Sequence, residues 1–263
     1  MQIGFVGLGD LGSWIANRLI ASKLGPMAVF DADPQAMQRY EQSEVTLAQG
    51  LTDVGFTSAD IVGVCVVNDA QTRDVVNGLL AGPMRPGSVI AVHSTVDPET
   101  CRELCTQADA AGVGLMDAGI SKSGHLVMVG ANDSTFARAL PYLKGIGDNV
   151  EHAGQVGSGE IVKLIVNLLI ATEMGTAATV LSCCEQLGVN RDQVIRSLLT
   201  TDGHRGIRTL QATADRAALV HRLLGKDVDT ATDVLSRGGC DTSFLRAASD
   251  AGLAAVHANI SKG

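Results

Sequence analysis

Aromatic residues and clusters of basic residues are scarce in this chain of 263 residues. Phe, Trp and Tyr together make up 3% of it, and 20 Lys and Arg against 28 Asp and Glu give a formal net charge of -8 at pH 7. No run of Lys or Arg offers the electrostatic footprint that nucleic acid or an anionic membrane surface needs. We therefore expect neither as a partner.

Cysteine is also rare, and its spacing excludes the common metal sites. The six cysteines are Cys65, Cys101, Cys105, Cys183, Cys184 and Cys240. Cys101 and Cys105 could share a helix face, but no histidine or second cysteine pair completes a tetrahedral set of ligands. We expect no metal, and reduced thiols in a cytoplasmic protein.

Targeting and membrane-spanning segments are not evident. The chain opens with Met1–Val6, without a basic region or a cleavage-site pattern. The most apolar run, residues 161–170, is interrupted by Lys163 and Asn167 and falls short of the roughly 20 residues that span a bilayer. With 46% hydrophobic and 18% charged residues, the composition is typical of a globular protein of one large or two modest domains.

The first motif that is present joins a short apolar strand, residues 3–6, to a helical pattern. It reads GxGxxG, and the residues predicted to contact a dinucleotide are Gly7, Leu8, Gly9, Asp10, Leu11 and Gly12. The first glycine of this motif permits a tight turn, the second lets the backbone approach a pyrophosphate, and the third allows close packing of helix and strand. The helix N-terminus then supplies N–H groups and partial positive charge to the phosphates.

An acidic residue follows the second predicted strand, residues 27–30. Asp31 lies about 19 residues after Gly12, near the spacing of the acid that binds the adenosine ribose. A carboxylate there repels a 2′-phosphate, which favours NAD over NADP. Asp31 could instead cap the next helix, but Asp33 is better placed for that role.

Two further apolar segments, residues 60–67 and 88–92, read as buried parallel strands. Ligands of open α/β sheets lie outside the carboxyl ends of the strands. We therefore expect the cofactor to face Val66, Val67, Asn68, Ser94 and Thr95. His93 lies in the same place and could be catalytic, but a lone histidine at the end of a strand is more often a packed or capping residue, so we give it no part in the mechanism.

A tight connection separates the predicted strands 114–119 and 126–130. It contains Ser121, Lys122 and Ser123. Their hydroxyls, backbone N–H groups and ammonium suit an anionic group of a substrate. A polar hairpin turn explains the same residues equally well.

The remaining pattern predicts an α/β fold in two domains. Residues 1–153 form a Rossmann-type doubly wound sheet, and residues 154–263 form a long interdomain helix followed by an all-helical domain. The long interdomain helix is predicted to end near residue 187. Four further helices are predicted, at residues 191–200, 208–224, 227–237 and 243–258. Because their apolar faces exceed what a small helical domain buries, we expect a homodimer or tetramer.

Two polar residues interrupt the apolar helix that follows the glycine-rich turn 154–159. Lys163 and Asn167 are four residues apart, so their side chains share one helix face. A buried ammonium needs a partner, a cavity or a substrate, whereas a snorkelling lysine reaches solvent. The helix alone leaves both interpretations open.

Taken together, four blocks resemble the β-hydroxyacid dehydrogenase family, which includes 3-hydroxyisobutyrate dehydrogenases and tartronate semialdehyde reductases. The blocks are Gly4–Gly12, His93–Pro98, Asp117–Ser121 and Gly154–Asn167, and the pair Lys226-Asp227 matches a further family position.

The resemblance implies a function and a role for several residues. Lys163 would be the catalytic general acid/base, Asn167 would support it and the substrate, and Thr95 would contact the nicotinamide side. Cys65 would lie along the cofactor, and Lys226 would reach back towards the cofactor and active site. The implied reaction is NAD- or NADP-dependent hydride transfer with a small 3-hydroxy acid or semialdehyde as partner. Reduction of an imine or a non-acidic aldehyde, and a dinucleotide-binding sensor without turnover, are the alternatives.

One departure from the family concerns the loop after Ser121, which is about six residues short for its role in holding a substrate carboxylate. The segment 203–226 is trimmed as well. Lys122 stands in place of a glycine of that loop, so we expect its side chain to supply the contact to the carboxylate. On that hypothesis Lys122→Met raises KM for an acidic substrate more than it lowers kcat.

Overall fold

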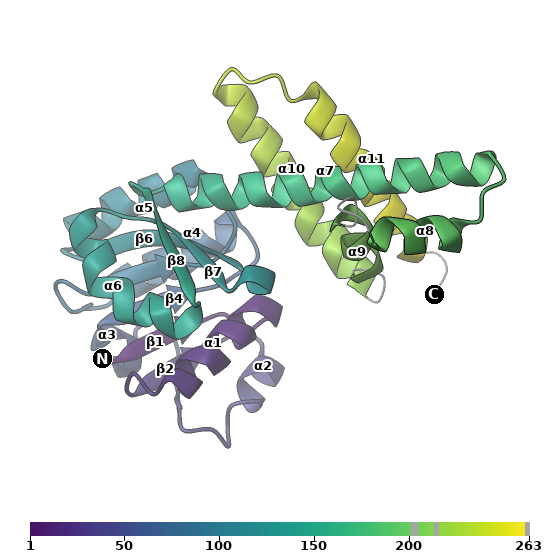
Figure 1. The fold of residues 1–263 in the computed structure, drawn as a ribbon. Coiled ribbons are helices and arrows are strands. Elements are labelled where there is room, and N and C mark those ends of the chain that lie inside the picture. Colours follow the sequence, from purple (N-terminus) through teal and green to yellow (C-terminus); the bar gives the residue numbers. More distant parts are fainter. Residues whose placement is uncertain (201–204, 213–215, 261–263) are drawn as a thin grey trace. The chain divides into compact units, whose positions relative to one another are not determined.

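The computed structural model describes residues 1–200, 205–212 and 216–260, and Figure 1 shows their fold. The chain divides into two compact units, Met1–Lys163 (unit 1) and Leu164–Gly263 (unit 2). The division lies inside a long helix, α7 (Ser158–Gln186), and not at the expected position 153/154. The first turn of that helix belongs to unit 1 because it packs on the sheet.

Unit 1 contains one eight-stranded sheet of order β3-β2-β1-β4-β5-β6-β7-β8, which confirms the doubly wound fold. Its strands are β1 Ile3–Val6, β2 Met27–Phe30, β3 Thr46–Leu47, β4 Ile61–Val64, β5 Val89–Val92, β6 Gly114–Ser121, β7 Leu126–Gly130 and β8 Asn149–Gly154. β7 runs antiparallel to β6, and the neighbours from β3 to β6 are parallel. β4 ends at Val64, so the predicted strand 60–67 is too long: residues 65–67 leave the sheet and line a pocket instead.

Helices cover both faces of this sheet (Figure 1). The helices of unit 1 are α1 Asp10–Ser22, α2 Pro34–Gln38, α3 Val54–Thr57, α4 Asp69–Leu80, α5 Pro98–Ala110 and α6 Asp133–Ile146. Apolar side chains of α1, α2 and α6 form the core on one face, and those of α3, α4 and α5 form the core on the other. The strand residues alternate between the two cores, as Phe5 and Val6 do.

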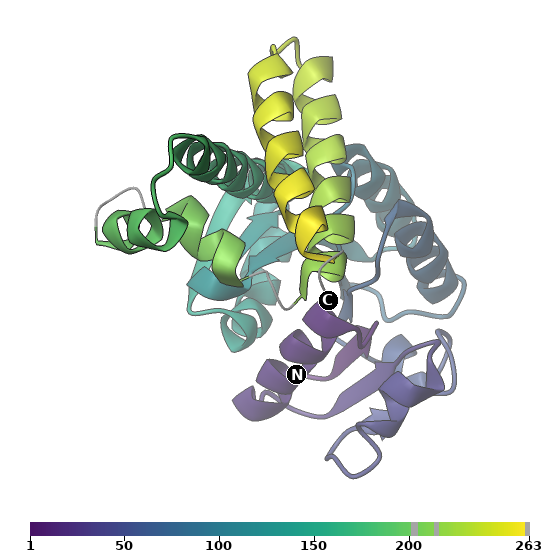
Figure 2. The same ribbon diagram turned by 90° about the vertical axis from the view of Figure 1, so that its right-hand side faces the viewer.

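Unit 2 is helical throughout its described residues. It contains the larger part of α7 together with α8 Arg191–Leu199, α9 Arg205–Ala212, α10 Ala217–Arg237 and α11 Ser243–Ile260. α10 and α11 lie side by side as an antiparallel pair (Figure 2). α10 passes unbroken through Gly225, so the predicted break between 224 and 227 is wrong; an interior glycine costs a helix only about 1 kcal/mol. Of the predicted helix 208–224, residues 213–215 lie outside the described residues.

The 29 residues of α7 are long and apolar enough, by length and composition, to cross a membrane. The mean hydropathy of its most apolar 18-residue window is 1.7, and 39% of that window is buried. The core helix of a water-soluble protein meets the same criterion. In unit 2 that role is visible, because Leu164, Leu168 and Ala171 pack in one core cluster with Val228 and Ala231 of α10.

Candidate dinucleotide-binding and active site

The glycine motif has the geometry that a dinucleotide needs. Gly7 has a φ of +94°, and a side chain there would collide with the carbonyl of Cys65. A side chain at Gly12 would collide with the carbonyl of Gly7, so this glycine permits the close packing of α1 on the turn. Nothing lies within 4 Å of the place where a Cβ of Gly9 would be, which leaves its backbone open to a phosphate.

The peptide group of Leu8, between these glycines, is held from both sides. Its N–H donates to Oδ2 of Asp31 at 2.5 Å, and its carbonyl accepts from Nη2 of Arg39 at 2.5 Å. Asp33 accepts from the N–H of Gln35 and caps α2, which confirms that the cap role does not fall to Asp31. The carboxylate of Asp31 lies at the end of β2, where Oδ2 accepts the N–H of Leu8 and Oδ1 accepts the N–H of Asp33 at 2.8 Å, and its contact with a ribose stays a prediction.

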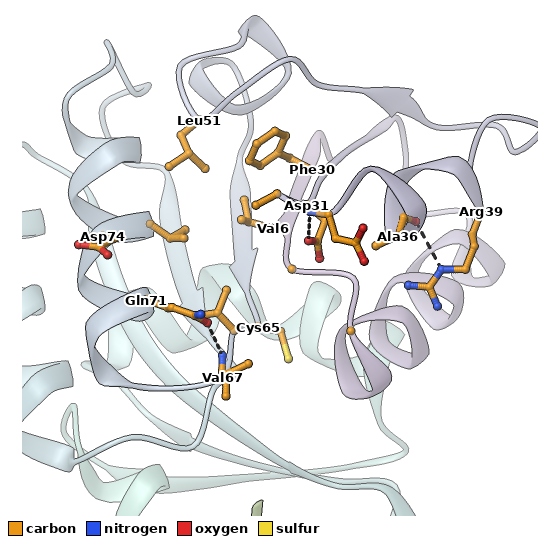
Figure 3. A pocket seen from close by; sticks show the side chains of 16 residues that line it. Val6, Phe30, Asp31, Ala36, Arg39, Leu51, Cys65, Val67, Gln71 and Asp74 are labelled. Carbon is orange, nitrogen blue, oxygen red and sulfur yellow. Dashed lines mark hydrogen bonds between the residues drawn. The ribbon is translucent and has the colours of Figure 1, made fainter. Parts of the chain in front are cut away.

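A pocket of about 540 Å³ lies beside this loop. Figure 3 shows Asp31 and Arg39 on one side of it and Gln71 and Asp74 of α4 on the other. Of the predicted cofactor residues, the pocket is lined by Gly7, Gly9, Asp31, Cys65, Val66 and Val67. The other predicted residues of unit 1 lie outside this lining: Leu8, Asp10, Leu11, Gly12, Asn68 and Thr95. The pocket contains the carboxylate expected beside the adenosine ribose of a dinucleotide.

Polar residues at the ends of β4 and β5 form hydrogen bonds that hold the backbone beside the pocket. Oγ of Ser94 accepts from the N–H of Val66 at 2.8 Å, and the side chain of Asn68 caps α4. His93 is fully buried, with its ring nitrogens 2.8 Å from the carbonyl of Ala118 and from the hydroxyl of Tyr142. Burial lowers the pKa of His93 to about 4, so its ring is neutral and serves packing.

The start of α7 is capped from a distant strand. The buried carboxylate of Asp117 in β6 accepts the N–H of Gly157 at 2.5 Å and that of Glu160 at 2.7 Å. A side chain at Gly159 or Gly130 would press on the same carboxylate, at 2.8 Å and 2.5 Å. Burial raises the pKa of Asp117 to about 6, against the lowering effect of the N–H donors.

Lys163 is placed by the same strand. Asp117 and Gly119 are two residues apart on β6 and so face the same side of the sheet. A Cβ at Gly119 would lie 2.8 Å from Cβ and 3.0 Å from Cγ of Lys163, so any larger residue at this position would displace the stem of this lysine. The predicted catalytic residue is thereby fixed within unit 1, at the carboxyl-terminal part of β6.

The predicted substrate-binding residues form the tip of the β6–β7 hairpin. A single 3-10 turn, η1 (Lys122–Gly124), joins the strands, and Oγ of Ser121 lies 3.4 Å from Oγ of Ser123. The ammonium of Lys122 is 2.9 Å from Oδ2 of Asp10, at the start of α1.

Unit 2 holds the other predicted residues together. Nδ2 of Asn167 donates to Oδ2 of Asp227 at 2.7 Å, and Nζ of Lys226 lies 3.3 Å from Oδ1 of the same carboxylate. Asn167 and Asp227 also line a cavity of about 230 Å³ whose other walls are mainly apolar, such as Met174 and Leu223. Asp227 is 7% exposed, so this carboxylate fixes the orientation of the Asn167 amide.

Comparison with known proteins assigns the chain to a family. Residues 2–154 match the NAD binding domain of 6-phosphogluconate dehydrogenase. An uncharacterized oxidoreductase of Mycobacterium tuberculosis is 32% identical over 199 residues, which are 72% of this chain and 66% of that protein. The mitochondrial 3-hydroxyisobutyrate dehydrogenase of Rattus norvegicus is 32% identical over 185 residues, 66% of this chain and 55% of that protein. The chain belongs to the β-hydroxyacid dehydrogenase family.

The match extends to structure. A 3-hydroxyisobutyrate dehydrogenase of Mycobacterium tuberculosis, solved with L-serine, superposes with a TM-score of 0.82 over 97% of this chain and 98% of that one, at 23% identity. This likeness shows the β-hydroxyacid dehydrogenase fold. The aligned region spans less than two thirds of the length of the two relatives named above.

Three residues that shape the site in this family member were given no role from the sequence. Asp117 could have been found, because an acid inside an apolar strand must have buried partners. Asp227 stood in a block that matches the family, beside Lys226. Arg39 carried no signal, since an arginine at the end of a short helix is common on any surface.

Proposed function

We propose that the protein is an NAD-dependent oxidoreductase that interconverts a small 3-hydroxy acid and the corresponding semialdehyde. The main support for the proposal is the position of Lys163. The aliphatic part of its side chain packs against Gly119, which lies within the region that matches an NAD binding domain. The names of relatives, which include oxidoreductases and a 3-hydroxyisobutyrate dehydrogenase, support the same class of reaction.

In the proposed reaction, separate residues transfer the proton, form hydrogen bonds near it and bind the cofactor. When bound, the nicotinamide accepts or delivers the hydride. The ammonium of Lys163 donates a proton to the carbonyl oxygen during reduction, and its neutral amine accepts the hydroxyl proton during oxidation. Asn167, oriented by Asp227, holds a hydrogen-bonding amide one helical turn further along α7. The glycine turn and Asp31 bind the pyrophosphate and the ribose.

A spectrophotometric screen tests this proposal. NADH and NADPH are each offered with semialdehydes, keto acids and cyclic imines, and oxidation of the cofactor is followed. We expect turnover with semialdehydes. Turnover restricted to imines would favour the reductase alternative, and tight NADH binding without any turnover would favour a sensor.

The proposed cofactor preference follows from the charges that line the pocket. Its lining contains the carboxylates of Asp31, Asp33 and Asp74 and the guanidinium of Arg39. We expect NADH to bind at least about tenfold more tightly than NADPH, a difference of roughly 1.4 kcal/mol. Asp31→Asn keeps an acceptor for the N–H of Leu8 but removes the charge, so it should reduce this preference. Fluorescence titration with both cofactors measures it, and tighter binding of NADPH to the wild type would contradict the assignment.

The proposed homodimer or tetramer is supported by apolar residues on α7. Ile165, Leu169 and Val180 are 46%, 49% and 43% exposed in the single chain. Contact with a second copy would remove this apolar surface from water. Light scattering coupled to size-exclusion chromatography should report at least twice the 27.2 kDa of one chain. A monomer at micromolar concentration would exclude this assembly.

A further inference from the structure

The short β6–β7 hairpin contacts α1 directly at two of its residues and, through Asp148 just before β8, at a third point; Asp148 Oδ2 lies 2.7 Å from Nδ1 of His125 in the hairpin. The residues of α1 that make these contacts are Asp10, Trp14 and Arg18, which are four apart and share one helix face. In order, they meet Lys122 at 2.9 Å, the ring of His125 at a centroid distance of 6.1 Å, and Asp148 at 3.5 Å. The guanidinium of Arg18 also lies over the ring of Trp14, 5.3 Å from its centroid. The tip of the hairpin is therefore held along α1.

The first contact lies where the dinucleotide phosphates bind. Nζ of Lys122 is 2.9 Å from the carboxylate of Asp10 and 3.2 Å from its carbonyl oxygen. Asp10 is the first residue of α1, and the N-cap residue before it, Gly9, has no side chain to occupy the helix N-terminus. The open space beside Gly9 is where a phosphate approaches such a helix.

The charges at this point oppose cofactor binding unless Lys122 is present. A diphosphate carries negative charge, and the Asp10 carboxylate beside it repels that charge. The Lys122 side chain is 36% exposed, so its ammonium can exchange water for phosphate oxygens without leaving Asp10.

We propose that Lys122 binds the diphosphate of the dinucleotide, sharing its ammonium between the phosphate oxygens and Asp10. The proposal rests on the dinucleotide binding of the proposed function and is independent of the substrate and of Lys163. It replaces the contact to a substrate carboxylate that the sequence led us to expect from Lys122. The shortened hairpin thus serves the cofactor, because it brings a cation to the phosphate turn.

Binding of NADH in the absence of substrate tests this role directly. Lys122→Met should raise the Kd for NADH roughly tenfold, as expected for loss of a charge-assisted hydrogen bond. Lys23→Met is the matched control: it removes the same charge from the opposite end of α1, where Lys23 is exposed, and should leave Kd unchanged. With saturating NADH, KM for the substrate should stay near the wild-type value. An unchanged Kd together with a raised KM would restore the substrate role and overturn the proposal.

A second variant separates direct contact from simple neutralisation of Asp10. Asp10→Asn removes the repulsive carboxylate and should tighten NADH binding. If Lys122 touches the diphosphate, the double variant Asp10→Asn/Lys122→Met binds NADH clearly more weakly than Asp10→Asn alone. Equal affinities of these two variants would refute the contact while leaving the proposed function intact. A wild type that binds neither NADH nor NADPH would instead remove the proposed function itself.

Discussion

We expect Lys163→Ala to lower kcat at least ~100-fold while the Kd for NADH stays within a few-fold of the wild type. The reason is that the variant loses the proton donor and acceptor, whereas the glycine turn and the pocket around Asp31 are untouched. Steady-state kinetics with the substrate found by the screen, together with fluorescence titration of NADH, measures both quantities. Full activity of Lys163→Ala would remove this residue from the mechanism.

A second variant tests the position of the Lys163 side chain while keeping its amine. Gly119→Ala places a Cβ 2.8 Å from that of Lys163, which must then shift, so we expect a smaller loss of kcat, about tenfold. Gly114→Ala is the matched control on the same strand, because its Cβ would meet Thr135 at 3.0 Å instead. The two variants should lose similar stability, but the control should keep its kcat.

The second large effect concerns Asp117 and the pH dependence of stability. Burial raises the pKa of this carboxyl to about 6 from 3.8, so the folded protein holds its proton more tightly than the unfolded chain does. This contribution to stability is complete below the unfolded pKa and is lost as pH rises through the folded one. A shift of this size corresponds to about 3 kcal/mol. Ionisable residues near it include Glu160, which donates its N–H to Asp117, and Cys101, whose thiol pKa is raised by burial and by the carboxylates of Glu160, Asp117 and Asp69.

Asp117→Asn removes this titration and keeps one acceptor for the start of α7. Between pH 4 and pH 8 the Tm of the wild type, measured relative to this variant, should therefore fall by roughly 5–10 °C. Asp53→Asn is a control of opposite sign, because the N–H groups of Gly55 and Gln49 lower the pKa of Asp53. Against that variant the wild type should gain stability as pH rises. If the difference in Tm between the wild type and Asp117→Asn did not change with pH, the raised pKa of the buried Asp117 carboxyl would be contradicted.

The sequence predicted the sheet well because its signals are local. β1, β2, β4, β5 and β7 are short apolar runs bounded by glycine or polar residues, and the GxGxxG turn is recognised from three glycines within six positions. β3 and α3 were not predicted, since two and four residues are too few to show a period. Gly225 misled the prediction for α10 because packing on α7 and α11 outweighs one glycine.

The site was predictable only where function follows from a position in the chain. The predictions for Gly7, Asp31 and Lys163 rest on positions of this kind. The cap on α7 joins Asp117 to residues 40 and 43 positions away, and the Lys122–Asp10 pair spans 112. No local pattern encodes such distances, so those contacts needed the fold. The contact of Lys122 with Asp10 is the observation from which we propose a role for Lys122 in cofactor binding.

The two hydrogen bonds to the peptide group of Leu8 affect the entropy change of cofactor binding. The N–H of Leu8 is bonded to Asp31 and its carbonyl to Arg39, so contacts within the protein hold the glycine turn in place, and we expect it to be ordered in the absence of a ligand. Binding therefore need not fix this segment, and the conformational entropy that a mobile loop would lose is spared. Slow hydrogen exchange at the Leu8 amide in the ligand-free protein would be the signature of that preorganisation.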